Sequence, residues 1–402
     1  MAGYRDLLRT PGVGRIIAAQ LTARFPSGMT SLAVLLHVEH ITGSYGAAGL
    51  VLAAASIGQA IAGPITSRWM GLWGMRRGLT LTMLVCAASI AGIALLSLPL
   101  PAFMAFGMLA GLSTPPVQPA GRTIYPKMVN SRQLTPLFSL DASLQEIIWI
   151  LAPVVVTFVS TQISTVVGLL AIVVILLAGG SWFISSPELG QVRIPRSRRR
   201  FGKVLSRPPV LLATFVGFLL IGACAAVEAG VVATFGEGGI EAGLVLAVFS
   251  IGSLGGGLIS GGIPIGRWAM ARRMGIVMLG LVVTTVSLNV WWIGGSLLVA
   301  GIGVAPAFAV ISAMTTASVK FSDTAEAFGW VNTGQLIGAA AGSAVAGFLI
   351  DGLGPAGSYW TAAMFAAAGL LVSAVFHRGF PDLRHRDPSP LPDTEPVRTI
   401  MS

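Results

Sequence analysis

Apolar segments of about 20 residues alternate with short polar stretches along almost the whole chain. A helix needs roughly 20 apolar residues to cross a bilayer, and twelve such segments lie between glycine, proline and charged breaks. We place them at residues 16–38, 45–66, 79–98, 102–122, 137–159, 165–184, 210–233, 242–263, 276–293, 297–318, 327–350 and 359–376. The pattern therefore predicts an all-α polytopic membrane protein with twelve transmembrane helices.

Composition supports this class. Hydrophobic residues make up 54% of the chain and charged residues 10%, whereas a soluble globular protein usually carries about 25% charged residues. The net charge of +10 does not indicate nucleic-acid binding, because the basic residues lie at the ends of apolar segments. Cys86 and Cys224 lie inside apolar segments, so we expect neither a disulfide nor a metal or redox site.

The basic residues indicate the topology. Of the 25 Lys and Arg residues, 24 lie in the N-terminal tail, in alternate loops or at the C-terminal end, and only Arg24 lies deep inside a predicted span. By the positive-inside rule, both termini are cytoplasmic and the number of spans is even. The basic stretch up to Arg15 leads into an apolar segment too long for a removable signal peptide. We expect a multi-pass protein of the cell (plasma) membrane.

The chain contains an internal repeat. Residues 48–58 and 242–252 are identical at nine of eleven positions. Later pairs lie 190 residues apart: Pro116 and Pro306, Phe138 and Phe328, Gln145 and Gln335. Two similar six-helix units about an axis along the membrane normal are the architecture of major facilitator transporters. The predicted organisation is an N-terminal bundle at 1–185, a basic cytoplasmic linker at 186–209, a C-terminal bundle at 210–378 and a disordered cytoplasmic tail at 379–402.

Three local sequences strengthen this resemblance. They are ARFPSGMTSLAVLL followed by TGSY at the first span, LDASLQE in the fifth, and AAVEAGVVATF in the seventh. The chain resembles a twelve-helix, efflux-type permease of the major facilitator superfamily, similar to members common in actinobacteria. The resemblance covers residues 15–378. It implies alternating access, in which two pseudo-symmetric six-helix bundles rock around a central cavity lined mainly by spans one, four, seven and ten.

The loop after the second span departs from the family motif. In the family this loop is usually Gly-x-Leu-x-Asp-Arg-x-Gly-x-Arg, but here Gly71 replaces the acid and Leu72 replaces the first arginine. The charge relay that latches the two halves in many relatives is therefore altered. The residues that the resemblance still implies for a cytoplasmic gating loop are Arg68, Gly74, Arg76 and Arg77.

Charged residues inside the hydrocarbon region are costly and persist when they face a cavity or a partner. Arg24 lies about 13 Å into the first span, and Glu146 lies at nearly the same depth in the fifth. Since the family places these spans side by side, we expect an Arg24–Glu146 ion pair that a proton arriving at Glu146 breaks. A permanent structural salt bridge is the alternative. We expect Asp141, about one turn from the cytoplasmic end of its span, to be solvated.

Other polar residues in the spans are candidates for lining a cavity or contacting substrate. Glu228 lies in the outer third of the seventh span, with no obvious basic partner at its depth. The alternative is a neutral acid bonded to a backbone carbonyl. Gln145 and Gln335 are equivalent in the two halves, and Asn332 lies one turn before Gln335. Such amides either line a pathway or join helices.

Prolines and small residues indicate where spans bend or approach closely. Pro26 and Gly28 interrupt the first span. Ala152-Pro153 stands where the antiporter signature of the family has Gly-Pro, and alanine still allows close packing. The glycines that we expect at a sliding contact between the halves are Gly58, Gly63, Gly252, Gly257, Gly334, Gly338 and Gly342.

The leading functional prediction is a secondary transporter, not an enzyme, that exports small amphipathic or hydrophobic molecules in exchange for protons. The alternatives are an uptake symporter, an uncoupled facilitator or, from another class, a membrane enzyme or receptor. An enzyme is disfavoured because the sequence has no Asp-x-x-Asp pair, histidine cluster within a span or phosphate-binding glycine loop. We expect a monomer in the lipid bilayer, with a small-molecule substrate, the proton gradient as energy source, and no cofactor, metal or nucleic acid.

Overall fold

A computed structural model describes residues 2–192, 195, 200–236, 240–384 and 386–393. This part of the chain is helical apart from loops and one parallel bridge between Lys320 and Leu391. The helices are α1 (Ala2–Arg9), α2 (Val13–Thr42), α3 (Tyr45–Trp73), α4 (Met75–Leu95), α5 (Leu100–Leu112), α6 (Val117–Met128), α7 (Ser131–Gln162), α8 (Thr165–Ser185), α9 (Pro187–Gln191), η1 (Lys203–Ser206), α10 (Pro208–Phe235), α11 (Ile240–Ser260), α12 (Ala269–Thr284), α13 (Val290–Ser318), α14 (Phe321–Leu353), α15 (Pro355–Val375) and η2 (His377–Gly379).

The helices supply twelve membrane segments. Ten stretches of the described chain are long and apolar enough to cross a bilayer, and α5 with α6 forms one of them. The first segment is α2, whose 30 residues include several charged ones, and the ninth is α12, which has 16 residues. The prediction of an all-α fold with twelve membrane helices in two six-helix bundles is confirmed.

Equivalent close contacts show the repeat in three dimensions. In the N-terminal half, a Cβ on Gly58 of α3 would overlap the carbonyl oxygen of Met108 in α5. In the C-terminal half, a Cβ on Gly252 of α11 would overlap the carbonyl oxygen of Leu298 in α13. Because glycine has no side chain, each helix pair approaches backbone to backbone. These two glycines therefore pack within their own halves and not at the expected contact between halves.

The boundary between the ninth and tenth spans differs from the prediction. The predicted ninth span at 276–293 is displaced, because α12 already ends at Thr284. The side chain of Asn289 then caps the next helix, with Asn289 Oδ1 accepting a hydrogen bond from Trp291 N at 3.0 Å. A tryptophan that we assigned to the end of the ninth span therefore begins the tenth.

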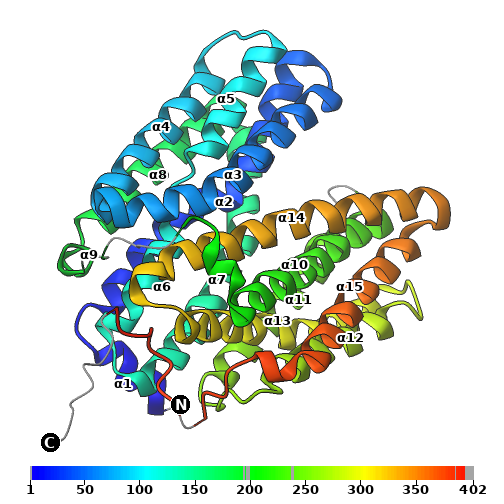
Figure 1. Ribbon diagram of the computed structural model, residues 1–402. Coiled ribbons are helices and arrows are strands. Elements are labelled where there is room, and N and C mark those ends of the chain that lie inside the picture. Colours follow the sequence, from blue (N-terminus) through cyan, green and yellow to red (C-terminus); the bar gives the residue numbers. More distant parts are fainter. Residues whose placement is uncertain (1, 193–194, 196–199, 237–239, 385, 394–402) are drawn as a thin grey trace, which may run out of the picture.

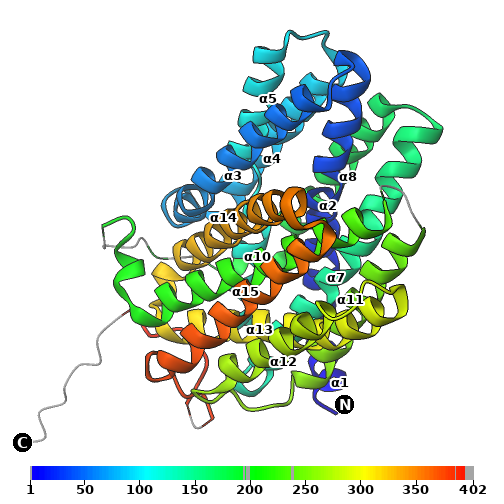
Figure 2. The same ribbon diagram turned by 90° about the vertical axis from the view of Figure 1, so that its right-hand side faces the viewer.

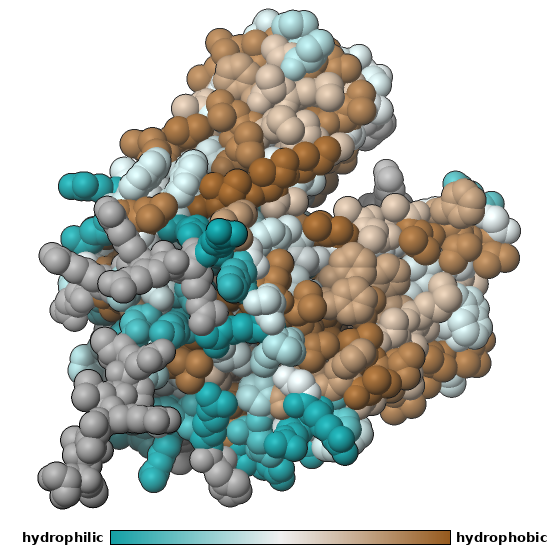
Figure 3. Space-filling model, viewed as in Figure 1, coloured by the Kyte–Doolittle hydropathy of each residue, from teal (hydrophilic) through white to brown (hydrophobic). Residues whose placement is uncertain are grey.

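The two halves touch along two lines and separate at one end. α3 packs against α14, and α7 packs against α11 and α13, as two perpendicular views show (Figures 1 and 2). We call the end that carries the N-terminus, α9 and the C-terminal segment the basic end. Hydrophilic residues gather there, whereas a notch divides the two lobes on the other side (Figure 3). The molecule is closed at the basic end and open at the opposite end.

Part of the C-terminal tail is docked on the basic end. Leu391 N donates a hydrogen bond to Val319 O at 2.8 Å. Asp393 Oδ1 accepts one from Ser322 N at 3.1 Å, in the first turn of α14. The prediction of a disordered tail is wrong for this part of the chain, because backbone and side-chain hydrogen bonds fix it. Residues 394–402 lie outside the described residues.

Candidate functional site

A network of charged and polar side chains is buried in the N-terminal half. At its centre is Asp141 on α7, whose side chain is fully buried. Its Oδ1 accepts hydrogen bonds from Gln20 Nε2 at 2.7 Å, Arg24 Nη1 at 3.1 Å and Tyr125 OH at 3.2 Å. Its Oδ2 accepts one from Arg122 Nε at 3.0 Å. Four donors surround this group, which is the environment of an ionised, acceptor-only carboxylate.

The structure gives Arg24 a different partner from the expected one. Arg24 pairs with Asp141 rather than Glu146, and Asp141 is buried instead of solvated. The reason is the start of α7, which we expect at residue 137 but which lies at Ser131, where Asn130 and the third residue of the helix form a reciprocal cap. The additional turns of helix carry Asp141 into the bundle, where it faces α2 and α6.

Arg122 belongs to this network although the sequence did not single it out. We assigned it to the basic cytoplasmic residues at the end of the fourth span, but only 3% of it is exposed. The fourth span breaks after α5, where Pro115 and Pro116 cannot donate backbone hydrogen bonds. α6 then begins as a separate helix. The four-residue spacing of Gln118 and Arg122 places both on one face of α6, and this spacing was the available signal.

Two glutamine amides extend the network. Arg24 Nη2 donates to Gln145 Oε1. The side-chain amide of Gln118 lies between Gln145 and Arg122. It is 3.2 Å from Gln145 Oε1. With its oxygen turned toward Arg122, that oxygen accepts a hydrogen bond from Arg122 Nη2 at 2.8 Å. The N–H groups of Arg24 and Arg122 that do not bind Asp141 thus donate to neutral amide oxygens.

A small pocket between α6 and α14 borders this network. Its lining residues are Gln118, Pro119, Arg122, Phe328, Val331, Asn332 and Gln335. Asn332 and Gln335 therefore lie in one pocket, and Gln145 reaches it through Gln118. The structure brings three of the predicted cavity residues to one place between the halves.

Glu146 lies on α7 where the N-terminal half meets the C-terminal half. Its side chain is buried, and its Oε1 accepts a hydrogen bond from Ser253 Oγ of α11 at 2.9 Å. Ser253 Oγ in turn accepts one from Ala305 N of α13 at 3.1 Å. In the described part of the chain, Glu146 has no basic ion-pair partner. A buried carboxyl group thus joins the two halves through a hydroxyl group.

Glu228 lies apart from the Asp141 network. It is on the exposed side of α10, and no hydrogen bond or ion pair to it is found among the described residues.

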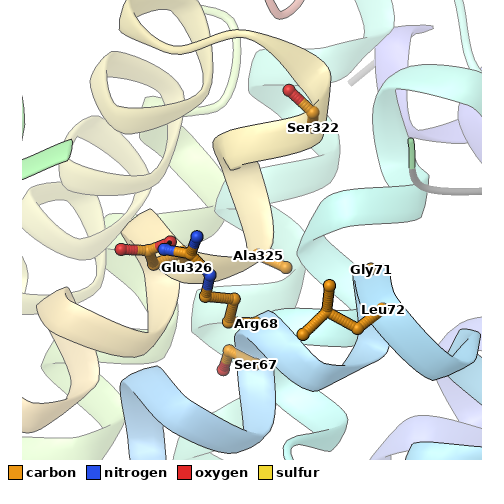
Figure 4. A pocket seen from close by; sticks show the side chains of 7 residues that line it. All are labelled: Ser67, Arg68, Gly71, Leu72, Ser322, Ala325 and Glu326. Carbon is orange, nitrogen blue, oxygen red and sulfur yellow. Dashed lines mark hydrogen bonds and ion pairs between the residues drawn. The ribbon is translucent and has the colours of Figure 1, made fainter. Parts of the chain in front are cut away.

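The halves are also joined at the basic end, where a pocket lies between α3 and α14 (Figure 4). Arg68 Nη1 donates to Glu326 Oε2 at 2.9 Å, and Gly202 N in the central linker donates to Glu326 Oε1 at 2.8 Å. Phe201 contacts both Arg68 and Trp330: the Arg68 guanidinium carbon lies 5.6 Å from the centre of its ring, and the Trp330 ring is tilted against it. The linker thus covers an ion pair between the two halves.

The other predicted gating residues remain in the N-terminal half. Arg76 Nη2 donates to Ser186 O at 3.2 Å, and Arg77 is exposed. Gly74 joins α3 to α4 with a φ of 89°, a left-handed conformation that favours glycine. Only Arg68 of the predicted set is found paired with the other half in the described structure.

Most of the predicted packing residues join helices within one half. α2 continues through Pro26 without interruption, contrary to expectation. A Cβ on Gly28 would lie 2.8 Å from the Cβ of Ala152, so α2 and α7 approach closely here. Pro153 follows inside α7, which is continuous through it.

The glycine stripe of α14 faces its own half. Cβ atoms on Gly334, Gly338 and Gly342 would meet backbone atoms of α10, so the expectation of a sliding contact between halves is wrong for these three. Gly63 does lie between the halves, where its Cβ would be 2.9 Å from Thr333 Oγ1. Gly257 likewise approaches Ser143 of α7.

Known proteins share this architecture. The family model for the Major Facilitator Superfamily matches residues 16–288 and 225–400. The human organic anion transporter TETRAN has 13% identity and a TM-score of 0.71, over 90% of this chain and 100% of that one. A bacterial homologue of the iron transporter ferroportin, in an outward-facing state, has 13% identity and a TM-score of 0.72, over 90% and 98%.

A proton:xylose symporter has 14% identity and a TM-score of 0.68, over 90% of this chain and 95% of that one. At these identities the similar structures establish the fold alone. A comparison with curated proteins gives no match.

Proposed function

Since this chain belongs to the major facilitator superfamily, we propose that it is a proton-coupled exporter of small amphipathic or hydrophobic molecules. Family and fold indicate a secondary transporter rather than an enzyme. The names of the similar structures mention an organic anion, iron and xylose, so the shared fold does not define the substrate. We place the protein in the cell membrane as a monomer, with the basic end and both termini in the cytoplasm.

The observation that carries the proposal is the position of Glu146. It is a buried carboxyl group between α7 and α11, on elements that belong to different halves. Burying an ionised carboxylate between helices without a cationic partner costs free energy. Proton binding removes this charge and changes the hydrogen bond with Ser253. The protonation state of Glu146 can therefore bias how the halves meet, which is what coupling to a proton gradient requires.

The contacts also suggest the sequence of events. In the present state the ion pair between Arg68 and Glu326 holds the basic end closed, and the notch opens on the opposite side. A proton that enters through the notch neutralises Glu146. The ion pair at the basic end then opens, the proton leaves toward the cytoplasm, and solute enters from there. Return to the present state releases the solute outside.

Transport into everted membrane vesicles tests this proposal, because only an exporter driven by proton exchange fills them when their interior is acidified. The probes are N-phenylnaphthylamine, which is neutral, and its sulfonated analogue, anilinonaphthalene sulfonate. We expect gradient-dependent accumulation of at least one probe, together with loss of protons from the vesicle interior. Glu146→Gln should abolish both signals while the protein remains folded.

Glu241→Gln is the matched control, since Glu241 is an exposed acid at the start of α11. It should leave accumulation unchanged. Gradient-driven accumulation that persists in Glu146→Gln would exclude the coupling role of Glu146. Probe movement that ignores the gradient, or that fills only right-side-out vesicles, would indicate an uncoupled facilitator or an uptake symporter instead.

A further inference from the structure

The charges of the Asp141 network do not balance. Two guanidinium groups, those of Arg24 and Arg122, share the single carboxylate of Asp141. Exposed fractions of 7%, 3% and 0% leave little water to screen them. The cluster therefore carries one surplus positive charge within the membrane-spanning part of the protein. A buried charge of this kind is costly unless a partner neutralises it.

No second acid supplies that partner in the described structure. Glu146 faces Ser253 of the other half instead of the arginines. The N–H groups that remain on Arg24 and Arg122 bind the amides of Gln145 and Gln118. An amide oxygen accepts the hydrogen bond but leaves the charge uncompensated. The cluster is thus hydrogen-bonded and still lacks an anion.

The unbalanced cluster opens onto a pocket with further donors. Arg122 and Gln118 form its wall on α6, and Gln335 and Asn332 form its wall on α14. Gln335 Nε2 is buried and has no hydrogen-bond partner in the described chain. Phe328 also lines the pocket, 5.9 Å from the guanidinium carbon of Arg122 to the ring centre. Guanidinium and amide donors thus lie beside an aromatic surface.

We propose that this pocket receives the anionic group of the substrate, such as a carboxylate or a sulfonate, while the apolar body of the substrate packs against Phe328 and Val331. The proposal rests on the transport function above and names its substrate class as amphipathic organic anions. The anion takes the place of the Gln118 amide at Arg122 and accepts the unpartnered hydrogen bond of Gln335. It thereby neutralises the surplus charge that Asp141 leaves.

Binding to purified protein in lipid nanodiscs tests this assignment without any gradient. The probes are again anilinonaphthalene sulfonate and N-phenylnaphthylamine, which differ by one sulfonate group, and empty nanodiscs are the blank. The unaltered protein should bind the sulfonate at least about tenfold more tightly, since hydrogen bonds to a charged group are the stronger ones. Equal affinity for the two probes, or no binding of the sulfonate, would overturn the proposal.

Arg122→Gln is the decisive variant. It leaves Arg24 and Asp141 as a balanced pair, so we expect it to fold with an unchanged or higher thermal midpoint. The Kd of the sulfonate should rise about tenfold or more, while that of the neutral probe changes less than about twofold. Arg122→Lys keeps the charge and should recover part of the sulfonate affinity. A parallel change for both probes would show that Arg122 only shapes the pocket.

Gln335→Leu provides a second route should Arg122→Gln not fold. It removes a hydrogen-bond donor without altering the charge cluster. The Kd of the sulfonate should rise a few fold, while the Kd of the neutral probe stays unchanged. A Gln335→Leu variant with unchanged sulfonate affinity would contradict the pocket geometry. Glu146→Gln should still bind the sulfonate. Absence of proton-coupled transport in the unaltered protein, together with the expected probe selectivity, would refute the exporter proposal alone. Proton-coupled transport without that selectivity would refute the anion pocket alone.

Discussion

The two halves share a sequence repeat and a helix arrangement, yet their charges differ. The buried cluster of Arg24, Arg122 and Asp141 lies in the N-terminal half. At an offset of 190 residues, Arg122 corresponds to Ser312 and Asp141 to Val331. Val331 is an apolar, buried side chain that borders the pocket beside Arg122. In the described structure, Ser312 Oγ donates to a carbonyl of its own helix. Duplication therefore supplied the architecture twice, whereas the ionic site was built once.

The C-terminal half places its ionic contacts elsewhere. Glu326 binds Arg68 at the basic end, and the equivalent position in the other half is Pro136. Within the membrane, this half is held by backbone contact between α10 and α14. One half thus carries the buried ionic cluster, and the other packs its helices α10 and α14 backbone to backbone. The comparison predicts that the same kind of substitution has different effects in the two halves.

The largest expected effect is in the C-terminal half. Gly338→Val places side-chain atoms against the carbonyl of Phe218 in α10, where a Cβ already overlaps. Since both partners are helix backbone, neither can move without separating the helices, so the cost lies well above the about 1–3 kcal/mol of overpacking that side chains can relieve. We expect loss of monodisperse protein by size-exclusion chromatography in detergent. Gly347→Val is the control on the same helix, because no atom lies within 4 Å of its Cβ position. Equal behaviour of the two variants would contradict the backbone contact.

The next effect is in the N-terminal half. Asp141→Asn leaves two buried guanidinium groups without a carboxylate, and breaking a buried pair costs about 3–5 kcal/mol. We expect a strong fall in the thermal unfolding midpoint. The double variant Asp141→Asn with Arg24→Gln restores the original net charge and should recover part of the loss. Val331→Asn is the matched substitution in the other half, where no ion depends on that position. A midpoint for Asp141→Asn above that of Val331→Asn would remove the difference between the halves.

The outcome for Asp141 shows how much of the fold and the site can be predicted from sequence. Apolar segment length and charge alternation identify the twelve spans, because bilayer thickness and topology constrain them. The duplication is identified by the repeated sequence at 48–58 and 242–252. They do not define helix ends, since polar turns outside the bilayer remain helical when a cap such as Asn130 stabilises them. The resulting shift in depth made Glu146 the expected partner of Arg24 in place of Asp141.

Arg122 shows a second limit. The positive-inside rule counts basic residues at the cytoplasmic ends of spans and does not distinguish a solvated arginine from one buried among helices. Burial of Arg122 depends on the break between α5 and α6 and on the packing of α6 against its neighbours. Such tertiary contacts cannot be derived from one sequence. Gln145 and Gln335 could be named as candidates from sequence, because they occupy equivalent positions in the two halves of the repeat.

An intermediate effect is expected at the ion pair between the halves. Glu326→Gln removes the charge that binds Arg68, although the amide oxygen still accepts from Gly202 N. Because the pair is partly exposed, we expect the free energy that favours the closed state to fall by about 1–2 kcal/mol. The fraction of molecules open at the basic end then rises about five- to thirtyfold. Distances between spin labels at Leu72 and Ser322, which line opposite walls of the pocket, measure this population.

Asp351→Asn is the control for that experiment. Asp351 is an exposed acid near the other end of α14. It should leave the label distances unchanged. An unaltered distance distribution in Glu326→Gln would show that hydrogen bonds and the linker close the basic end without the ionic contact. The ion pair of Glu326 would then have no part in closing it.

The smallest effect is expected in the docked tail, which reinforces the same α14 terminus. Asp393→Ala removes the carboxylate that accepts from Ser322 N, and loss of such a cap costs about 1 kcal/mol. The open population measured with labels at Leu72 and Ser322, as above, should rise about fivefold at most. Asp387→Ala is the matched control, since its carboxylate bonds Ser389 N within the tail. A larger effect for Asp387→Ala than for Asp393→Ala would show that the tail acts through its own folding rather than through the cap on α14.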